Sequence, residues 1–320
     1  MMKEGLCSMH HFRSLLAFLC AVLILLSTTA ALADLKPLPL DQKKHGVVPF
    51  KSGWLSENEY QDESIHVELT SYSMWPEYSN GRVGGHVAVV TIKDPSQLRT
   101  AMSQDDYDDE RQDRPLDMAK KANAVVSCNA DFMKYYYGIG YIVRQGEFYR
   151  DALDGTRDVL VIDEEGNFTS VENATHDTMK AHLDEMEKDG HSPVNTFSFG
   201  PVLVRDGVPR DESELRASPQ KMEAHLTAQR IAIVQLDTLT YAIVMVEGGD
   251  GRGMRLMEFS KWIAELFPEC KLAYNLDGGN SVHLMVYDTA MNRVRVVHNQ
   301  VGSRPISDII YFASIATEEP

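Results

Sequence analysis

Hydrophobic residues recur along most of this chain in the patterns expected of β-strands. Residues 65–70 alternate apolar and polar side chains, which predicts a strand with one buried face. Residues 86–92 and 124–128 are apolar almost throughout, as in strands that are covered on both faces. Two more apolar runs, 231–236 and 242–246, are joined by a short polar segment and predict a hairpin.

Helices are expected at fewer places. Apolar residues spaced three and four positions apart predict helices over 175–188 and 256–267. Short helices are expected over 96–102, directly after an Asp-Pro pair, and over 115–122. The segment 197–207 is predicted as one strand that is interrupted by Gly-Pro and closed by an Asp-Gly turn.

The first 33 residues have the organisation of a signal peptide. Lys3 and Arg13 precede an apolar stretch at 15–26, and an Ala-Leu-Ala sequence at 31–33 has the form of a cleavage site. The apolar stretch is shorter than the roughly 18 residues expected of a spanning helix. We therefore expect cleavage after this segment and a secreted or extracytoplasmic protein of the cell envelope, with an uncleaved N-terminal anchor as the alternative.

Two features follow from that expectation. Residues 34–58 are rich in Pro, Lys and Gly and lack periodicity, so we expect a linker or mobile arm before a domain at 59–320. Cleavage would leave Cys128 and Cys270, which could pair in an oxidising compartment or remain two separately buried thiols. The sequence leaves both states of the thiols open.

Composition and charge limit the classes of ligand. The chain has 320 residues, of which 43% are hydrophobic and 24% charged, as in a globular protein. A formal net charge of −16 disfavours broad binding of nucleic acid or an anionic membrane. The glycine-rich segment 247–253 lacks the Gly-Lys-Ser/Thr of a phosphate-binding loop, and we expect no cofactor.

The segment 275–281 carries an acid and two glycines between two apolar runs. One interpretation is the turn of a hairpin, for which Asp-Gly between apolar runs is typical. The other is a strand end that presents Asp277 for function, because loops at strand ends hold functional groups on a rigid scaffold. Residues before and after this segment favour the second interpretation.

Five motifs occur in the order and rough spacing of the phosphodiester glycosidase family, which the chain resembles over about 65–314. They are Asn-Ala-Asp-Phe at 129–132, Phe-Gly-Pro-x-Leu-Val at 199–204, Arg-Ile-Ala-Ile at 230–233, Asn-Leu-Asp-Gly-Gly-x-Ser at 275–281 and Arg-Pro at 304–305. The resemblance implies an α+β fold, with a twisted mixed β-sheet, flanking helices and a single catalytic domain. It also implies a hydrolase that frees a sugar from a phosphodiester-linked carbohydrate.

The chain departs from the family pattern at Met133, Val234 and Asn280. Asn280 adds a side chain where the backbone approaches a substrate, so the resemblance does not fix the preferred sugar.

Breaking the anomeric bond of a sugar phosphate calls for acids that stabilise an oxocarbenium-like transition state and activate water or attack directly. Asp277 and Asp131 are the expected pair, with Asp277 as nucleophile or base and Asp131 as its partner or as an acceptor for a sugar hydroxyl. Glu247, at a strand end beside the glycine-rich segment, is a substitute for either. Each acid could instead accept hydrogen bonds from turn amides.

Guanidinium groups match phosphate oxygens, so Arg230 and Arg304 are the candidate phosphate ligands. A structural ion pair is the alternative for Arg304. The backbone amides of Gly278 and Gly279 could add donors.

The remaining candidates bind substrate or hold the turn. These are Asn129, Asn275 and Ser281, with His225 as a proton shuttle or ordinary surface residue. No metal-ligand pattern stands out in the sequence, although a bound cation stays open.

Three hypotheses remain open. The first is an exported glycosidase that acts on sugar-1-phosphodiesters. The second is a catalytically inactive carbohydrate-binding protein of the same fold. The third is a phosphodiesterase that cleaves the P–O bond, which would be expected to need a metal cluster.

Overall fold

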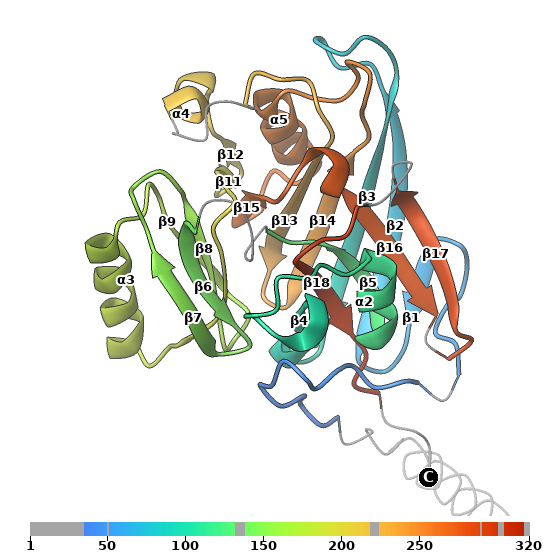
Figure 1. Cartoon of the computed structure of the whole chain (residues 1–320). Coiled ribbons are helices and arrows are strands. Elements are labelled where there is room, and N and C mark those ends of the chain that lie inside the picture. Colours follow the sequence, from blue (N-terminus) through green and yellow to red (C-terminus); the bar gives the residue numbers. More distant parts are fainter. Residues whose placement is uncertain are drawn as a thin grey trace, which may run out of the picture. The chain divides into compact units, whose positions relative to one another are not determined.

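A computed structural model describes residues 35–49, 51–131, 138–217, 224–288, 290–299 and 304–316, shown in Figure 1. Contacts group Lys36–Pro320 into one compact unit. The predicted signal peptide at 1–33 lies outside the described residues. No helix in the described ranges is long and apolar enough to span a membrane.

Two large antiparallel sheets form the centre of this unit. The eight-stranded sheet has the order β1 (Glu59–Gln61), β2 (Ile65–Met74), β3 (Val83–Ile92), β14 (Thr240–Val246), β13 (Arg230–Asp237), β15 (Leu272–Asn275), β11 (Val202–Arg205) and β12 (Val208–Pro209). The five-stranded sheet has the order β17 (Arg293–Asn299), β16 (His283–Asp288), β5 (Ala124–Asn129), β18 (Asp308–Ala313) and β4 (Leu98–Met102).

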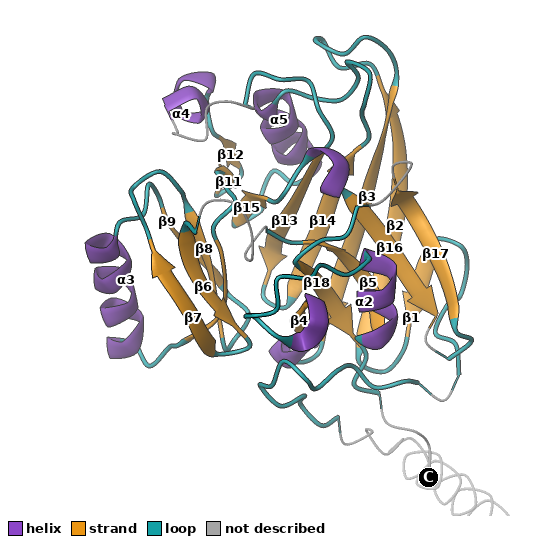
Figure 2. Ribbon diagram, viewed as in Figure 1, coloured by secondary structure: helices purple, strands orange, loops and turns teal. Residues whose placement is uncertain are grey.

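Smaller sheets and helices complete the fold (Figure 2). A three-stranded sheet has the order β10 (Pro193–Phe197), β8 (Val159–Asp163) and β9 (Phe168–Val171), and a hairpin pairs β6 (Gly140–Arg144) with β7 (Glu147–Ala152). The α-helices are α2 (Pro115–Lys121), α3 (His176–Lys188), α4 (Glu212–Ala217) and α5 (Leu256–Leu266). The 3₁₀ turns within the described residues are η1 (Pro95–Gln97), η2 (Ser103–Asp105) and η3 (Gly279–Ser281). The predicted α+β class is confirmed, and the strands of these sheets pair in antiparallel fashion throughout the described residues, where a mixed sheet was expected.

The main hydrophobic core lies between the two large sheets. Ile233 of the eight-stranded sheet and Val126 of the five-stranded sheet are both completely buried in it. A second core lies on the other face of the eight-stranded sheet, where Val234 packs with Phe259 of α5. Because successive side chains of a strand point to opposite faces, β13 needs apolar residues at nearly every position. This explains the continuous apolar run in the sequence.

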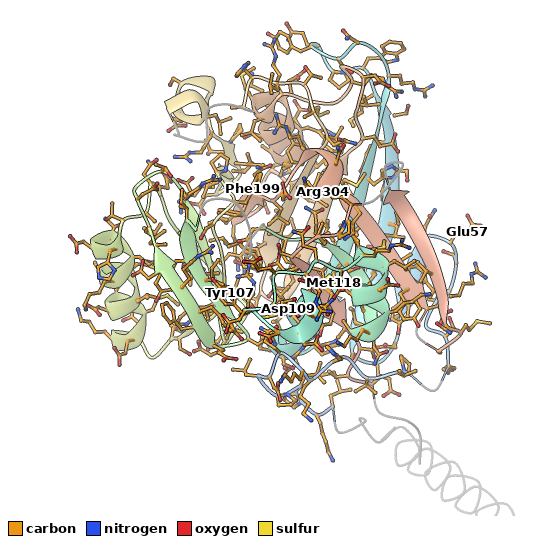
Figure 3. The ribbon with its side chains drawn as sticks, in the orientation of Figure 1. Glu57, Tyr107, Asp109, Met118, Phe199 and Arg304 are labelled. Atoms are coloured by element: carbon orange, nitrogen blue, oxygen red, sulfur yellow. The ribbon has the colours of Figure 1, made fainter. Side chains whose placement is uncertain are left out.

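Helix α2 covers the other face of the five-stranded sheet. Its Met118, labelled in Figure 3, packs in a third core with Ile309 and Tyr311 of β18. The result is a layered arrangement of α5, the eight-stranded sheet, the five-stranded sheet and α2. Polar groups at the ends of these strands are therefore held on a rigid scaffold.

Several predicted elements are present and two are different. The hairpin of β13 and β14 and the helices α3 and α5 are confirmed. The expected helix at 96–102 is wrong. Only the short 3₁₀ turn η1 is helical there, and the residues after it form β4, which pairs with β18 along its length. The expected single strand at 197–207 is also wrong, because β10 and β11 belong to different sheets.

Cys128 and Cys270 are free, buried thiols. They lie in different cores, Cys128 between the two large sheets and Cys270 beside α5. Burial raises the pKa of both thiols.

The segment that we expected to be a linker or mobile arm is attached to the domain by Arg99. This fully buried side chain donates from Nη2 to the backbone oxygens of Pro39, Asp41 and Lys44 at 3.0, 3.1 and 2.9 Å. Backbone bonds from Gly46 and Val47 to the domain add to this attachment. An arginine that donates to three carbonyl oxygens thus fixes a stretch that has no secondary structure of its own.

Replacing Arg99 should release that segment. In Arg99→Met the three carbonyl oxygens lose their donor, so the free energy of unfolding should fall by about 1–3 kcal/mol. Trypsin should also cleave faster after the exposed Lys43 and Lys44. Denaturant unfolding and limited proteolysis followed by mass spectrometry measure both effects, with Arg111→Met, at an exposed arginine, as the control. Unchanged cleavage at these lysines would contradict the attachment.

Candidate active site at the sheet crossover

Asp277 lies where the chain passes from the eight-stranded sheet to the five-stranded sheet. Leu276 N donates to Ile231 O of β13 at 2.9 Å. One residue later, Asp277 N donates to Ala130 O at 3.0 Å, and Asn129 Nδ2 donates to Asp277 O at 2.6 Å. Both backbone polar groups of Asp277 are therefore bonded to the end of β5, at Asn129 and the next residue, Ala130.

The hairpin interpretation of 275–281 is wrong, because β15 and β16 lie in different sheets. Gly278 allows close packing at the crossover, and Gly279 allows a positive φ. A side chain at Gly278 would place its Cβ 3.2 Å from Gln229 O and 4.0 Å from Arg230 Nη1. Gly279 has φ of 58°, which favours glycine, and its N–H donates to Gln229 O at 3.3 Å. That amide is thus engaged with protein, whereas the sequence suggested it as a phosphate donor.

Asp277 presents its carboxylate beside Arg304, which is labelled in Figure 3. Arg304 Nη2 lies 3.3 Å from Asp277 Oδ2, and the side chains are 57% and 15% exposed, respectively. Ser281 Oγ accepts from Arg304 Nε at 2.9 Å and from Nη2 at 2.6 Å. The structure therefore brings together three predicted site residues, with the guanidinium of Arg304 exposed and the carboxylate of Asp277 partly exposed.

Arg230 lies beneath the crossover rather than at the surface. It is 2% exposed, and its Nε and Nη2 donate to the backbone oxygens of Met254 and Leu226 at 3.3 and 2.8 Å. The side chain points to the face of β13 that carries α5. These contacts give Arg230 a role in fixing the loops around the crossover, and its role as a phosphate ligand stays a prediction.

Asp131 is near the crossover in the chain, but its carboxylate is turned into a buried ion pair. Arg144 Nη2 lies 3.0 Å from Asp131 Oδ1 and 2.7 Å from Asp308 Oδ2, and all three side chains are almost fully buried. Ser198 N donates to Asp131 Oδ2 at 3.0 Å. Burial raises the pKa of Asp308 to about 8, against the opposing effect of Arg144. Sequence reasoning missed Arg144 and Asp308, since no local pattern joins them.

Glu247 follows β14 at the same end of the sheet. Its Oε1 lies 2.9 Å from His86 Nε2, and its Oε2 accepts from Gly84 N at 3.3 Å. A Cβ on Gly84 would lie 2.5 Å from the carboxyl carbon of Glu247. Sequence reasoning missed His86, although the Gly-Gly pair before an apolar strand was a signal that another group approaches this backbone.

Three other predicted residues have different surroundings. Asn275 is buried, and its Nδ2 donates to Gly200 O at 2.7 Å, so it holds the turn between β10 and β11. Asn129 contacts Asp277 as described and accepts from His283 N at 3.2 Å. His225 is exposed in the loop before β13. Asn129 and Asn275 therefore act at least as scaffold, and substrate contacts by any of the three stay predictions.

Two positions discussed from the sequence, Phe132 of the first motif and Met133, lie outside the described residues. Within the part of the chain that the structure describes, no three His, Cys, Asp or Glu side chains gather as a metal site requires.

His283 should make the stability of the fold depend on pH. Burial lowers its pKa to about 4, and Nε2 has no partner in the described ranges. The folded state therefore favours the neutral ring, and the stability present above the unfolded pKa of about 6.5 should fall as the pH drops toward 4. The loss should reach roughly 3 kcal/mol. Urea unfolding at several pH values measures this effect. In His283→Gln the free energy of unfolding should fall less as the pH drops, and an equal fall in the variant and the wild-type protein would contradict the prediction.

Asp131→Asn should lower the free energy of unfolding by about 1–3 kcal/mol, because Arg144 loses one of its two carboxylate partners in a buried site. Asp237→Asn, at the exposed end of β13, provides the control. Thermal and denaturant unfolding measure the difference. Equal stability of Asp131→Asn and the wild-type protein would show that the ion pair of Asp131 with Arg144 does not stabilise the fold.

Known structures share this fold. The catalytic domain of zebrafish N-acetylglucosamine-1-phosphodiester alpha-N-acetylglucosaminidase, auto-inhibited by its pro-peptide, is 16% identical with a TM-score of 0.60, over 82% of this chain and 87% of that one. A hypothetical protein from Synechocystis is 14% identical with a TM-score of 0.52, over 78% and 62% of the two chains. No curated protein matches the sequence significantly.

At these identities the structural likeness shows the fold alone. The sequence adds the family, since residues 122–313 match the phosphodiester glycosidase family and include Asp131, Arg230, Glu247 and Asp277. This match confirms the resemblance seen in the motifs and supports a glycosidase-like function. The chain belongs to the phosphodiester glycosidase family.

Proposed function

We propose that the protein hydrolyses the bond between the anomeric carbon of a sugar and an oxygen of a phosphodiester. The observation that carries this proposal is the carboxylate of Asp277, which is partly exposed, lies 3.3 Å from Arg304 and stands on a backbone bonded to both large sheets. A carboxylate held in one place beside a cation suits a substrate that combines an anomeric centre with a phosphate.

The chemistry assigns a task to each group. The C1–O bond breaks, its electron pair leaves with the phosphate monoester, and the oxygen of water adds to C1. A phosphate monoester leaves without a strong general acid, so the main demand is to stabilise the positive charge that develops at C1. Asp277 meets this demand as nucleophile or as the base that activates water. Arg304 offers its exposed guanidinium to the phosphate oxygens.

A second carboxylate is usual in glycoside hydrolysis. Glu247 fits this position better than Asp131 does. Glu247 is 35% exposed, whereas Asp131 is 3% exposed and bonded to Arg144. We therefore propose Asp277 and Glu247 as the pair, which changes the expected partner of Asp277.

The proposal that the protein acts outside the cytoplasm is based on the sequence. The predicted signal peptide at 1–33 supports export, and a phosphodiester-linked glycopolymer of the cell envelope is the substrate class that we propose. The zebrafish protein that shares this fold is named for its action on a sugar-1-phosphodiester, which agrees with this choice of bond.

Asp277→Asn should lower kcat by about 10²–10⁴-fold on a sugar-1-phosphodiester, because the amide can neither attack C1 nor accept a proton from water. Asp237→Asn, at the exposed end of β13, should retain wild-type activity. Release of free sugar from a panel of sugar-1-phosphodiesters measures the effect.

Hydrolysis in ¹⁸O-labelled water identifies the bond that breaks. The label should enter the sugar. Label in the phosphate would mean P–O cleavage and would replace the proposal with the phosphodiesterase hypothesis. Binding of these compounds without hydrolysis by the wild-type protein would favour the carbohydrate-binding hypothesis.

A further inference from the structure

Three polar side chains form a line across the eight-stranded sheet, on the face that packs against the five-stranded sheet. Ser71 of β2 and His86 of β3 are direct cross-strand partners. His86 is paired on its other side with Met245 of β14, two residues before Glu247. Side chains alternate along a strand, so Glu247 points to the same face as Met245, which belongs to the core between the large sheets. The line therefore lies where this core gives way to solvent.

Hydrogen bonds join the three side chains. Glu247 Oε1 lies 2.9 Å from His86 Nε2, and His86 Nδ1 lies 3.1 Å from Ser71 Oγ. An ionised carboxylate only accepts, so Nε2 carries the hydrogen and donates to Glu247, which leaves Nδ1 to accept from the Ser71 hydroxyl in the neutral ring. The second carboxylate oxygen accepts from Gly84 N at 3.3 Å. Both oxygens of Glu247 thus have a donor from β3.

Gly84 is required for this arrangement. A Cβ at this position would lie 2.5 Å from the carboxyl carbon of Glu247 and 2.7 and 2.8 Å from its oxygens. No side chain fits there unless the carboxylate moves. The bare backbone of β3 and the ring of His86 together define where the Glu247 carboxylate lies.

Gln229 connects this line to Asp277. The N–H of Gly279 donates to Gln229 O, and a Cβ on Gly248, next to Glu247, would lie 2.7 Å from Gln229 N. The segments that carry Asp277 and Glu247 therefore meet the same residue at the start of β13. Both carboxylates belong to one end of the eight-stranded sheet.

We infer that His86 is a positioning residue, which holds the Glu247 carboxylate in the orientation needed opposite the anomeric carbon, with Ser71 fixing the ring. This inference rests on the proposed function, because it names the group that prepares the second carboxylate. Residues that lock the side chain of a catalytic group act through geometry, and a misplacement of about 1 Å can cost about 10²-fold in rate.

Another pair provides an internal comparison. His66 Nε2 lies 3.2 Å from Glu59 Oε1, at the opposite end of β2. The two side chains are 36% and 43% exposed, against 13% for His86. His66 therefore shares the chemistry of His86 without its place at the crossover.

Two substitutions that introduce amide side chains test the two hydrogen bonds of the His86 ring separately. His86→Gln places an amide nitrogen near the position of Nε2 and keeps a donor for Glu247, whereas His86→Asn mimics Nδ1 and keeps only the contact with Ser71. His86→Ala and His86→Asn should each lower kcat about 10²-fold on a sugar-1-phosphodiester with KM changed less than about threefold, and His86→Gln should recover at least about tenfold of the loss. His66→Ala should leave both constants unchanged.

Other results would overturn the inference. If His86→Gln, His86→Asn and His86→Ala all lower kcat equally, the ring transfers a proton instead of positioning Glu247. If His86→Ala leaves kcat unchanged, Glu247 does not depend on His86 for its position. Thermal unfolding of each variant separates loss of folded protein from loss of kcat. Failure of the proposed function is distinct, because the wild-type protein would then release no sugar. In that case the NMR signals of the His86 ring, compared between Glu247→Gln and Glu59→Gln, still decide whether the contact exists.

Discussion

The change of sheet between two consecutive residues, Leu276 and Asp277, is the constraint on which the rest of the candidate site depends. At Asp277 the backbone leaves β13 and β15, and both its N–H and its C=O bond to the end of β5, at Ala130 and Asn129. Each such bond contributes only about 1 kcal/mol net, but leaving either group unpaired in a buried position would cost more. The crossover therefore admits few backbone conformations, and the carboxylate is presented from a fixed point.

Burial divides the polar residues around the crossover into two groups. Asp277, Glu247 and Arg304 keep contact with solvent, so they can meet a substrate. Asp131 and Arg230 are buried and have their polar atoms bonded to protein groups. A charge that has lost its hydration must be matched by protein groups, because burying it alone costs several kcal/mol. The family motifs thus contain both partly exposed charged groups, Asp277 and Arg304, and buried charged groups that belong to the scaffold, Asp131 and Arg230.

Short sequence patterns correctly predicted those elements that are defined by residues close together in the chain. The hairpin of β13 and β14 and the helix α5 follow from periodicity within a dozen residues, and both are present. The strand β4 was mistaken for a helix, since it is defined by its pairing with β18, more than 200 positions away. The attachment of residues 39–44 was missed for the same reason, because it depends on the carbonyl contacts of Arg99.

The sequence by itself determined the family and the class of fold, because those properties follow from short motifs and from hydrophobic periodicity. Tertiary structure alone decided which acids are accessible and which partners they have. His86 and Glu247 are 161 positions apart, and only the pairing of β3 with β14 brings them to 2.9 Å. Side-chain alternation is a local property, whereas strand pairing depends on contacts between distant parts of the chain.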